Sequence, residues 1–127
     1  MILAGIVAVA LLGVIAIFQA ALALGAPWGE AAWGGQNLGV LPRNLRIASG
    51  IAAAVIYPLI ILLVLAGAGL IDDGWVPVDT TIVMWILAAL LAVGAIMNAI
   101  SRSPRERLWA PIALVVAICC ALIAIGV

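Results

Sequence analysis

Charge is scarce in this sequence, and two residue types that can carry it are missing. Only 8% of the 127 residues are charged, and there is no histidine and no lysine, whereas a soluble domain has about 25% charged residues. Histidine is the commonest metal ligand and the usual general base near neutral pH. We therefore expect no metal site, no cofactor and no enzymatic activity. The net charge of zero argues against nucleic acid as a partner.

Most of the sequence consists of long apolar segments. Hydrophobic residues make up 69% of it, and four runs contain no charged residue. Each run is long enough to cross the ~30 Å hydrocarbon core of a bilayer as a helix that rises ~1.5 Å per residue. We therefore predict an all-α membrane protein, a four-transmembrane-helix bundle in contact with the lipid bilayer, in which residues 1–127 form a single transmembrane domain. The predicted spans are 2–24, 47–69, 81–100 and 108–126.

The first run has small residues at positions 21–26, as a signal-peptide cleavage site does. No basic residue precedes it, however, and its apolar stretch is longer than that of an ordinary signal peptide. We therefore expect it to be the first membrane crossing.

The arginines are distributed unevenly among the connections between runs. Residues 25–46 and 101–107 contain all five arginines, whereas residues 70–80 contain three aspartates and no arginine. Short arginine-rich loops remain on the cytoplasmic side of a membrane. We therefore predict that both termini and the acidic connection face the outside.

Two segments at the starts of the second and fourth runs resemble each other. Residues 42–48 and 104–110 both begin with Pro-Arg, contain a second arginine and have alanine at the seventh position. One interpretation is a pair of repeated helical hairpins, as in transporters built from parallel repeats. The alternative is a chance similarity between two arginine-rich loops.

Prolines and small residues predict how the helices bend and pack. Pro58 lies within the second run and Pro111 near the start of the fourth, so we expect a kink at each. Residues 103–106 match a capping box, which makes Glu106 a cap for backbone donors at the start of a short turn. Small residues recur every four positions in the second and third runs, and we expect these two helices to form the tightly packed centre of the bundle.

Three polar side chains lie at a similar depth, near the arginine-bearing ends of three runs: Gln19, Ser49 and Asn98. One interpretation is that they form hydrogen bonds between helices, which contribute about 0.6 kcal/mol each. The other is that they form the polar floor of a small cavity that opens to the cytoplasm. A buried amide in lipid needs a partner in either case, so both interpretations stay open.

The first connection, residues 25–46, is far longer than the about two to eight residues usual between helices. Trp28, Glu30 and Trp33 lie within it, among glycines and prolines. It is either an interfacial anchor with its indoles at headgroup level, or a lid. As a lid it would place Glu30 opposite Arg102 or Arg46, and its indoles would line a pocket for an apolar or cationic guest.

Several short phrases of the sequence are distinctive. They are residues 25–29, 32–35, 40–42 and 98–103, together with Glu106, Arg107 and Trp109. Over the whole chain these phrases resemble a set of small uncharacterised bacterial four-span inner-membrane proteins. The resemblance implies a location in the bacterial inner membrane and supplies no mechanism. Small multidrug resistance exporters have a similar size, but they rely on a carboxylate in the first crossing, and residues 2–24 contain none.

Two functions follow from these observations. The first is a non-enzymatic integral membrane protein that works by packing, as a homo-oligomer or as an accessory to a partner membrane subunit. The absence of any ionisable residue within the runs favours it, because coupled transporters usually need one. The alternative is a small-solute transporter or binder with a cytoplasmic polar vestibule. Its candidate residues are Gln19, Trp28, Glu30, Trp33, Ser49, Asn98 and Arg102, capped by residues 25–46.

Overall fold

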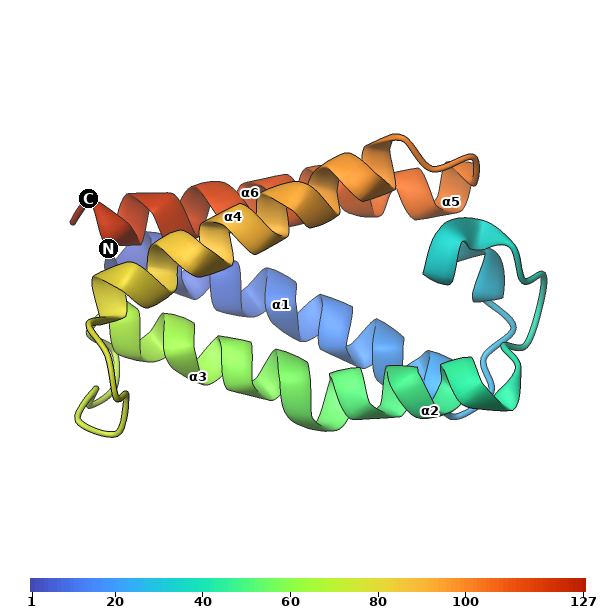
Figure 1. Ribbon diagram of the computed structural model, residues 1–127, viewed down its shortest axis with the longest axis horizontal. Coiled ribbons are helices and arrows are strands. Elements are labelled where there is room, and N and C mark those ends of the chain that lie inside the picture. Colours follow the sequence, from blue (N-terminus) through green and yellow to red (C-terminus); the bar gives the residue numbers. More distant parts are fainter.

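Four helices long and apolar enough to cross a membrane account for most of the chain. A computed structural model describes residues 1–127 and contains no β-strand. The predicted all-α architecture is therefore confirmed, and it is consistent with a four-helix bundle (Figure 1). The first and third crossings are α1 (Ile2–Ala23) and α4 (Thr80–Ala99). The second crossing comprises α2 (Arg43–Ile51), a π-helical segment (Ala52–Ile56) and α3 (Tyr57–Gly67), and the fourth comprises α5 (Pro104–Arg107) and α6 (Trp109–Ala124).

The outer surface of the bundle is apolar, and only 24 of the 127 residues are buried. Leu3, Ile17 and Met97 are 74%, 72% and 62% exposed. In water, leaving apolar surface exposed forfeits about 25 cal/mol per Å², and soluble monomers rarely expose contiguous apolar patches larger than about a few hundred Å². Lipid chains solvate such a surface without that cost. The exposed side chains therefore agree with a multi-pass membrane protein.

The helices pair into two hairpins. In the first, α1 packs along α2 and α3, and in the second, α4 packs along α6 (Figure 1). The contact between α4 and α6 is the most extensive in the bundle, and α3 touches α4 much less. The prediction that the second and third crossings form the tightly packed centre is therefore wrong. A four-residue spacing of small residues identifies a helix face that can pack closely, but it does not identify the partner.

Packing is uneven along the axis of the bundle. The main buried cluster lies in the half that contains both chain termini, and it draws on α1, α3, α4 and α6. Its fully buried members include Leu12, Val64, Met84, Val116 and Cys120. Toward the opposite end, the α1–α2–α3 hairpin and the α4–α6 hairpin diverge (Figure 1). One half of the bundle is therefore tightly filled and the other is splayed.

Two breaks interrupt the long helices. The helix before Pro58 widens into the π-helical segment Ala52–Ile56, because proline has no N–H and its ring disturbs the preceding turn. The second crossing changes direction there, as predicted (Figure 1). In the fourth crossing the break lies at Leu108, between α5 and α6. Pro111 lies three residues further on. Because proline has no N–H, the carbonyl of Arg107 receives no helical hydrogen bond from position 111.

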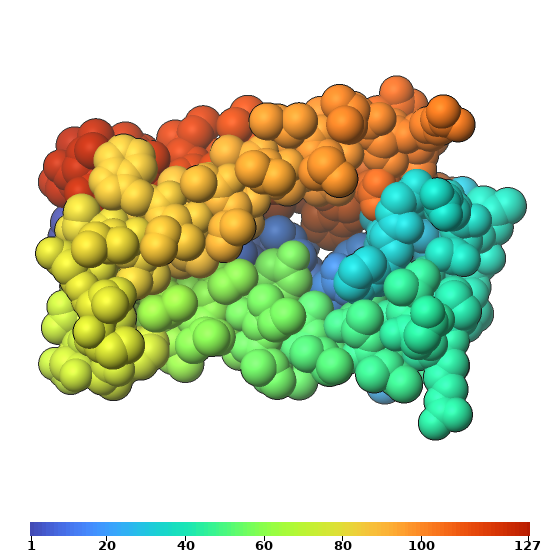
Figure 2. Space-filling model, in the orientation of Figure 1, coloured from blue at the N-terminus to red at the C-terminus, as the bar shows by residue number.

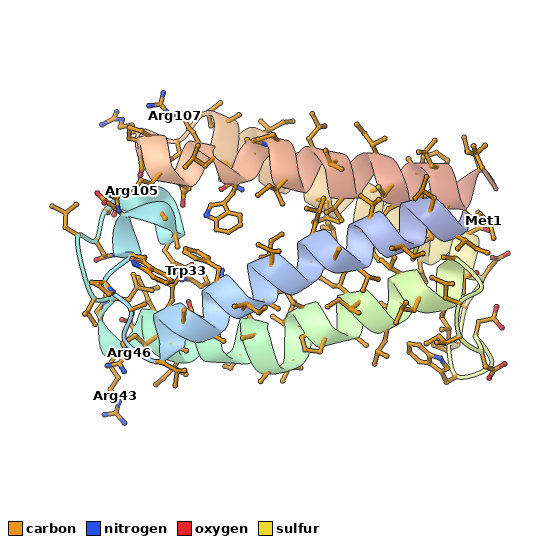
Figure 3. The ribbon with its side chains drawn as sticks, turned by 180° about the vertical axis from the view of Figure 1, so that it is seen from behind. Met1, Trp33, Arg43, Arg46, Arg105 and Arg107 are labelled. Atoms are coloured by element: carbon orange, nitrogen blue, oxygen red, sulfur yellow. The ribbon has the colours of Figure 1, made fainter.

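The two ends of the bundle differ in charge. Figure 3 shows Arg43, Arg46, Arg105 and Arg107 at the end opposite Met1. The acidic connection between α3 and α4 lies at the end that holds both termini (Figure 1). We call these the arginine end and the terminal end.

Candidate functional site

A cavity lies between the two hairpins where they diverge. Its volume is about 420 Å³, and it is lined by 18 residues, 14 of them hydrophobic. All four crossings and the connection between α1 and α2 contribute to its walls. Small-molecule sites in proteins are typically ~300–1,000 Å³, mostly apolar, with a few polar groups. Figure 2 shows the hollow open at the side of the bundle, between α4 and the α2–α3 helix, with α1 at its floor.

Three polar side chains line the cavity toward the arginine end: Gln19 from α1, Asn98 from α4 and Glu106 from α5. The Oε1 atom of Gln19 is buried and has no hydrogen-bond partner. Glu106 is only 7% exposed. An unpaired buried acceptor costs about 1–3 kcal/mol. The Gln19 side chain, which lines the cavity, therefore retains an unused capacity to accept a hydrogen bond.

Aromatic side chains are concentrated at this cavity. The chain has five tryptophans, one tyrosine and one phenylalanine, and four of these seven line it: Phe18, Trp33, Tyr57 and Trp109. The ring centroids of Phe18 and Trp109 lie 4.6 Å apart, with the planes tilted by 45°. Tilted pairs at this distance are a favoured aromatic arrangement. The rings of Phe18 and Trp109 therefore form one continuous aromatic surface between α1 and α6.

Residues 24–42, which connect α1 to α2, fold into a compact unit that we call the cap. The cap contains two 3₁₀ turns, Gly29–Ala31 and Trp33–Gly35. Its two ends are joined where the Gly29 N–H donates to the Gly39 carbonyl oxygen at 2.8 Å. A small buried core lies beneath it, formed by Leu22, Ala32 and Leu41. The long connection is therefore an ordered cover over the arginine end of the cavity.

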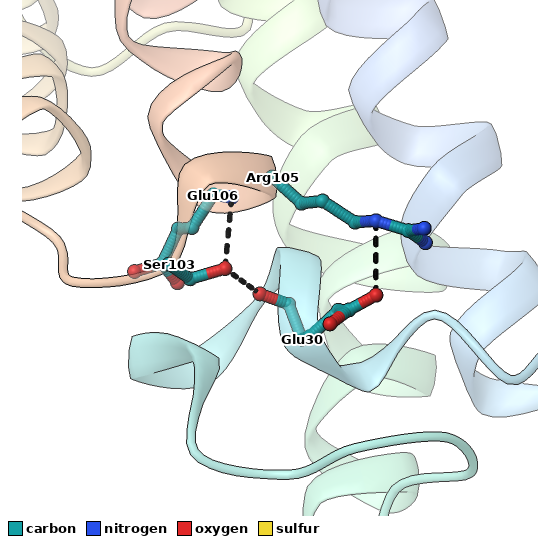
Figure 4. A network of polar contacts seen from close by, with 4 residues as sticks. All are labelled: Glu30, Ser103, Arg105 and Glu106. Carbon is teal, nitrogen blue, oxygen red and sulfur yellow. Dashed lines mark hydrogen bonds and ion pairs between the residues drawn. The ribbon is translucent and has the colours of Figure 1, made fainter.

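Polar contacts attach the cap to α5 (Figure 4). The Arg105 Nε atom lies 2.9 Å from Glu30 Oε1, and the Ser103 hydroxyl donates to the Glu30 carbonyl oxygen. The Gly34 N–H donates to Glu106 Oε2 at 2.8 Å. The Arg105 side chain is 61% exposed, and exposed ion pairs contribute only about 0–1 kcal/mol. The hydrogen bond to the buried carboxylate, at about 1.5–3 kcal/mol, is the stronger attachment.

Trp33 attaches the cap to the first hairpin as well. Its indole Nε1 donates to the Ser49 hydroxyl at 2.9 Å, and Ser49 is fully buried. Trp33 has a φ of 51°, a left-handed conformation that costs a residue with a side chain roughly 1–2 kcal/mol. The hydrogen bond and the cavity contact hold the indole in place despite that cost. Trp28 adds a further contact, since its ring stacks on Phe18 with the centroids 6.3 Å apart.

The structure divides the predicted site residues into three groups. Gln19, Trp33 and Asn98 line the cavity. Ser49 and Trp28 do not line it but hold the cap through Trp33 and Phe18. The cap covers the arginine end, and the opening in Figure 2 faces sideways, so the cavity differs from a polar vestibule that opens toward the cytoplasm.

Glu30 and Arg102 form the third group, outside the cavity. Both border a polar groove on the surface between the cap and α5. Glu30 thus shares a groove with Arg102, as one of the two expected alternatives had it, but its ion pair is with Arg105, because the short helix α5 directs Arg105 toward the cap. Arg46 donates from Nε to the carbonyl oxygen of Ala23, at 3.3 Å, and so caps the end of α1.

Glu106 and Tyr57 belong to the cavity, although the sequence did not mark them as site residues. Only the Ser103 half of the predicted capping box forms, in which the Ser103 hydroxyl accepts from the backbone N–H of Glu106 at 3.4 Å; the predicted capping of the start of α5 by the Glu106 side chain is wrong. The Glu106 carboxylate binds the cap instead. Tyr57 follows the π-helical segment and precedes Pro58, and such interruptions often occur at functional sites. Pro58 was therefore the sequence feature that could have indicated Tyr57 as a site residue.

No relative supplies a function for this site. Comparisons of the chain with protein-family models, with curated proteins and with solved structures each found no match.

Proposed function

We propose that this chain is a non-enzymatic integral membrane protein that binds an apolar or amphipathic small molecule between its two hairpins. The observation that carries the proposal is the cavity of about 420 Å³, which is lined by Gln19, a residue whose buried Oε1 atom has no hydrogen-bond partner. A bundle that acts only by packing gains nothing from such an acceptor, because an unpaired buried polar group destabilises the fold. A guest with a hydrogen-bond donor would satisfy it.

The side opening supports access from the lipid. A guest dissolved among the acyl chains would pass between α4 and the α2–α3 helix without crossing water (Figure 2). Its apolar part would contact lining residues such as Ile56 and Leu90, and its polar part would reach Gln19 and Asn98. Beyond the cavity, the terminal half of the bundle is filled by the main buried cluster. This arrangement supports binding rather than passage through the bundle.

The proposal places the arginine end in the cytoplasm and both termini outside. All five arginines occur in the two connections at that end, and the positive-inside rule supports this orientation. The cavity then lies in the cytoplasmic half of the membrane, beneath the cap. The resemblance to bacterial four-span proteins makes the bacterial inner membrane the proposed location.

Filling the cavity tests the proposal. Gly94 lines it from α4, and a Cβ atom added there meets no atom within 4 Å. Gly94→Leu would therefore occupy the cavity without an immediate clash, and it raises intrinsic helix propensity by about 1 kcal/mol. Gly13→Leu is the matched control. Gly13 is also helical and also has open space at its Cβ, but it does not line the cavity.

The probe is N-phenyl-1-naphthylamine, a neutral apolar fluorophore, added to purified protein in lipid nanodiscs. We expect saturable binding to the unaltered protein, at least about a tenfold loss of affinity in Gly94→Leu, and no change in Gly13→Leu. Thermal unfolding checks that both variants are folded. Equal binding by a folded Gly94→Leu, or no saturable binding at all, would contradict the proposal and favour the packing role, as a homo-oligomer or a partner subunit.

A further inference from the structure

We infer that the guest is an organic cation with an apolar body, and that Glu106 is its counter-ion. The inference rests on the proposed function, since it names the chemical class of the molecule that the cavity takes. Three features of the cavity wall support it: its charge, its free acceptors and its aromatic faces.

The charge of the wall is negative. Glu106 is the only Asp, Glu, Lys or Arg side chain that lines the cavity. The one ion pair in the chain joins Glu30 to Arg105 outside the cavity, so Glu106 has no cationic partner of its own. A buried carboxylate without a cation carries a large desolvation penalty. A cationic guest offsets that penalty, whereas an anionic guest would add repulsion to it.

The wall also offers free hydrogen-bond acceptors, beside the amide, hydroxyl and indole donors of other lining residues. Glu106 Oε2 accepts from the Gly34 N–H, while its Oε1 has no partner within the chain. Gln19 Oε1 is likewise unpaired. The Trp33 indole N–H, which would be a donor to a guest, is already used by Ser49. An ammonium group supplies donors to both free acceptors, while a carboxylate or sulfonate supplies none.

The aromatic faces fit the same guest. Phe18, Trp33, Tyr57 and Trp109 contribute rings from α1, the cap, the second crossing and α6. Cations within about 6 Å of such ring faces are attracted to them, most strongly where water is excluded. The same rings provide apolar contact for the body of the guest. A cavity lined by one carboxylate and several aromatic rings is therefore selective for charge and tolerant of shape.

A structural role for Glu106 must be separated from this one, because its carboxylate also holds the cap. The variant Glu106→Gln separates the two roles, since its amide oxygen can still accept from the Gly34 N–H although the negative charge is lost. Asp73→Asn is the matched control. Asp73 is exposed in the acidic connection at the terminal end, and its side chain takes part in no hydrogen bond or ion pair.

The test uses two probes of nearly identical shape and opposite charge, tetraphenylphosphonium and tetraphenylborate, with protein in nanodiscs of uncharged lipid. Specific binding is the saturable part that Gly94→Leu removes. We expect specific binding of the phosphonium and none of the borate. Glu106→Gln should weaken phosphonium binding about tenfold, and more than it weakens binding of neutral N-phenyl-1-naphthylamine, whereas Asp73→Asn should leave the binding of both probes unchanged.

The outcomes separate the two proposals. Saturable binding of the neutral probe, with equal phosphonium and borate binding to the unaltered protein, overturns the cation inference and leaves the proposed function intact. Equal phosphonium affinity in folded Glu106→Gln overturns it as well. Absence of saturable binding by any probe overturns both. If Glu106→Gln does not fold, the comparison of the two charged probes on the unaltered protein still decides the question.

Discussion

At the scale of single residues, the cap depends on backbone conformations that few residue types adopt. Trp33, Gly34 and Gly35 have φ values of 51°, 83° and 71° in succession. Such a run turns the chain sharply and directs the Trp33 indole toward Ser49 while exposing the Gly34 N–H to Glu106. The conformational cost falls mainly on Trp33, since glycine adopts a positive φ without penalty. The strained backbone at Trp33 thus places the cap in contact with both hairpins, through Ser49 and Glu106.

The same substitution, glycine to alanine, should have different effects at two positions of the cap. Gly39 has a φ of 77° and open space at its Cβ, so Gly39→Ala should cost only the backbone strain, about 1 kcal/mol. A side chain at Gly35 would in addition overlap the Cβ of Ser103. Gly35→Ala should therefore destabilise the protein more than Gly39→Ala and loosen the cap from α5. Thermal unfolding in detergent measures the difference, and equal melting temperatures would show that the cap does not dock on α5 as described.

At the scale of elements, the π-helical segment before Pro58 shapes the wall of the cavity. It adds one residue to the helical turn, and Ala52 and Ile56 within it both line the cavity. Without the proline, nothing would prevent a regular α-helix. The register between the two halves of the second crossing would then shift by one residue, a rotation of about 100°.

Pro58→Ala should therefore alter binding more than it alters stability. Removing a proline from a helix interior relieves up to about 3 kcal/mol of intrinsic cost, so we expect no fall in melting temperature. The shifted register should lower the affinity for N-phenyl-1-naphthylamine. Pro111→Ala is the control, because Pro111 lies in the first turn of α6 and does not line the cavity. Unchanged affinity in Pro58→Ala would mean that the segment is not needed for the site.

At the scale of the whole molecule, the sequence predicted the architecture better than the site. Four uncharged runs of membrane-spanning length are a strong signal, because lipid requires every backbone polar group to be satisfied within a helix. The pairing of α4 with α6 was not predictable, since small residues mark a face without naming its partner. The polar residues Gln19 and Asn98 were recognised because they are rare in apolar runs. Glu106 was assigned only a capping role, because its contact with Gly34 is 72 residues distant in sequence.

The proposed site depends on a bundle that spans the membrane, and two exposed positions at opposite ends of the bundle report both the spanning and its orientation. Gln36 lies in the cap at the arginine end, and Asp73 lies in the acidic connection at the terminal end. The native Cys119 and Cys120 are buried in α6, and both are replaced by alanine so that each variant carries a single thiol.

The most direct measurement is therefore the labelling of Gln36→Cys and Asp73→Cys in intact cells with a membrane-impermeant maleimide. The account predicts that Asp73→Cys is labelled at once and that Gln36→Cys is labelled only after the membrane is permeabilised. Labelling of both from outside would contradict the membrane-spanning bundle itself. Labelling of Gln36→Cys alone would invert the orientation and place the cavity in the opposite half of the bilayer.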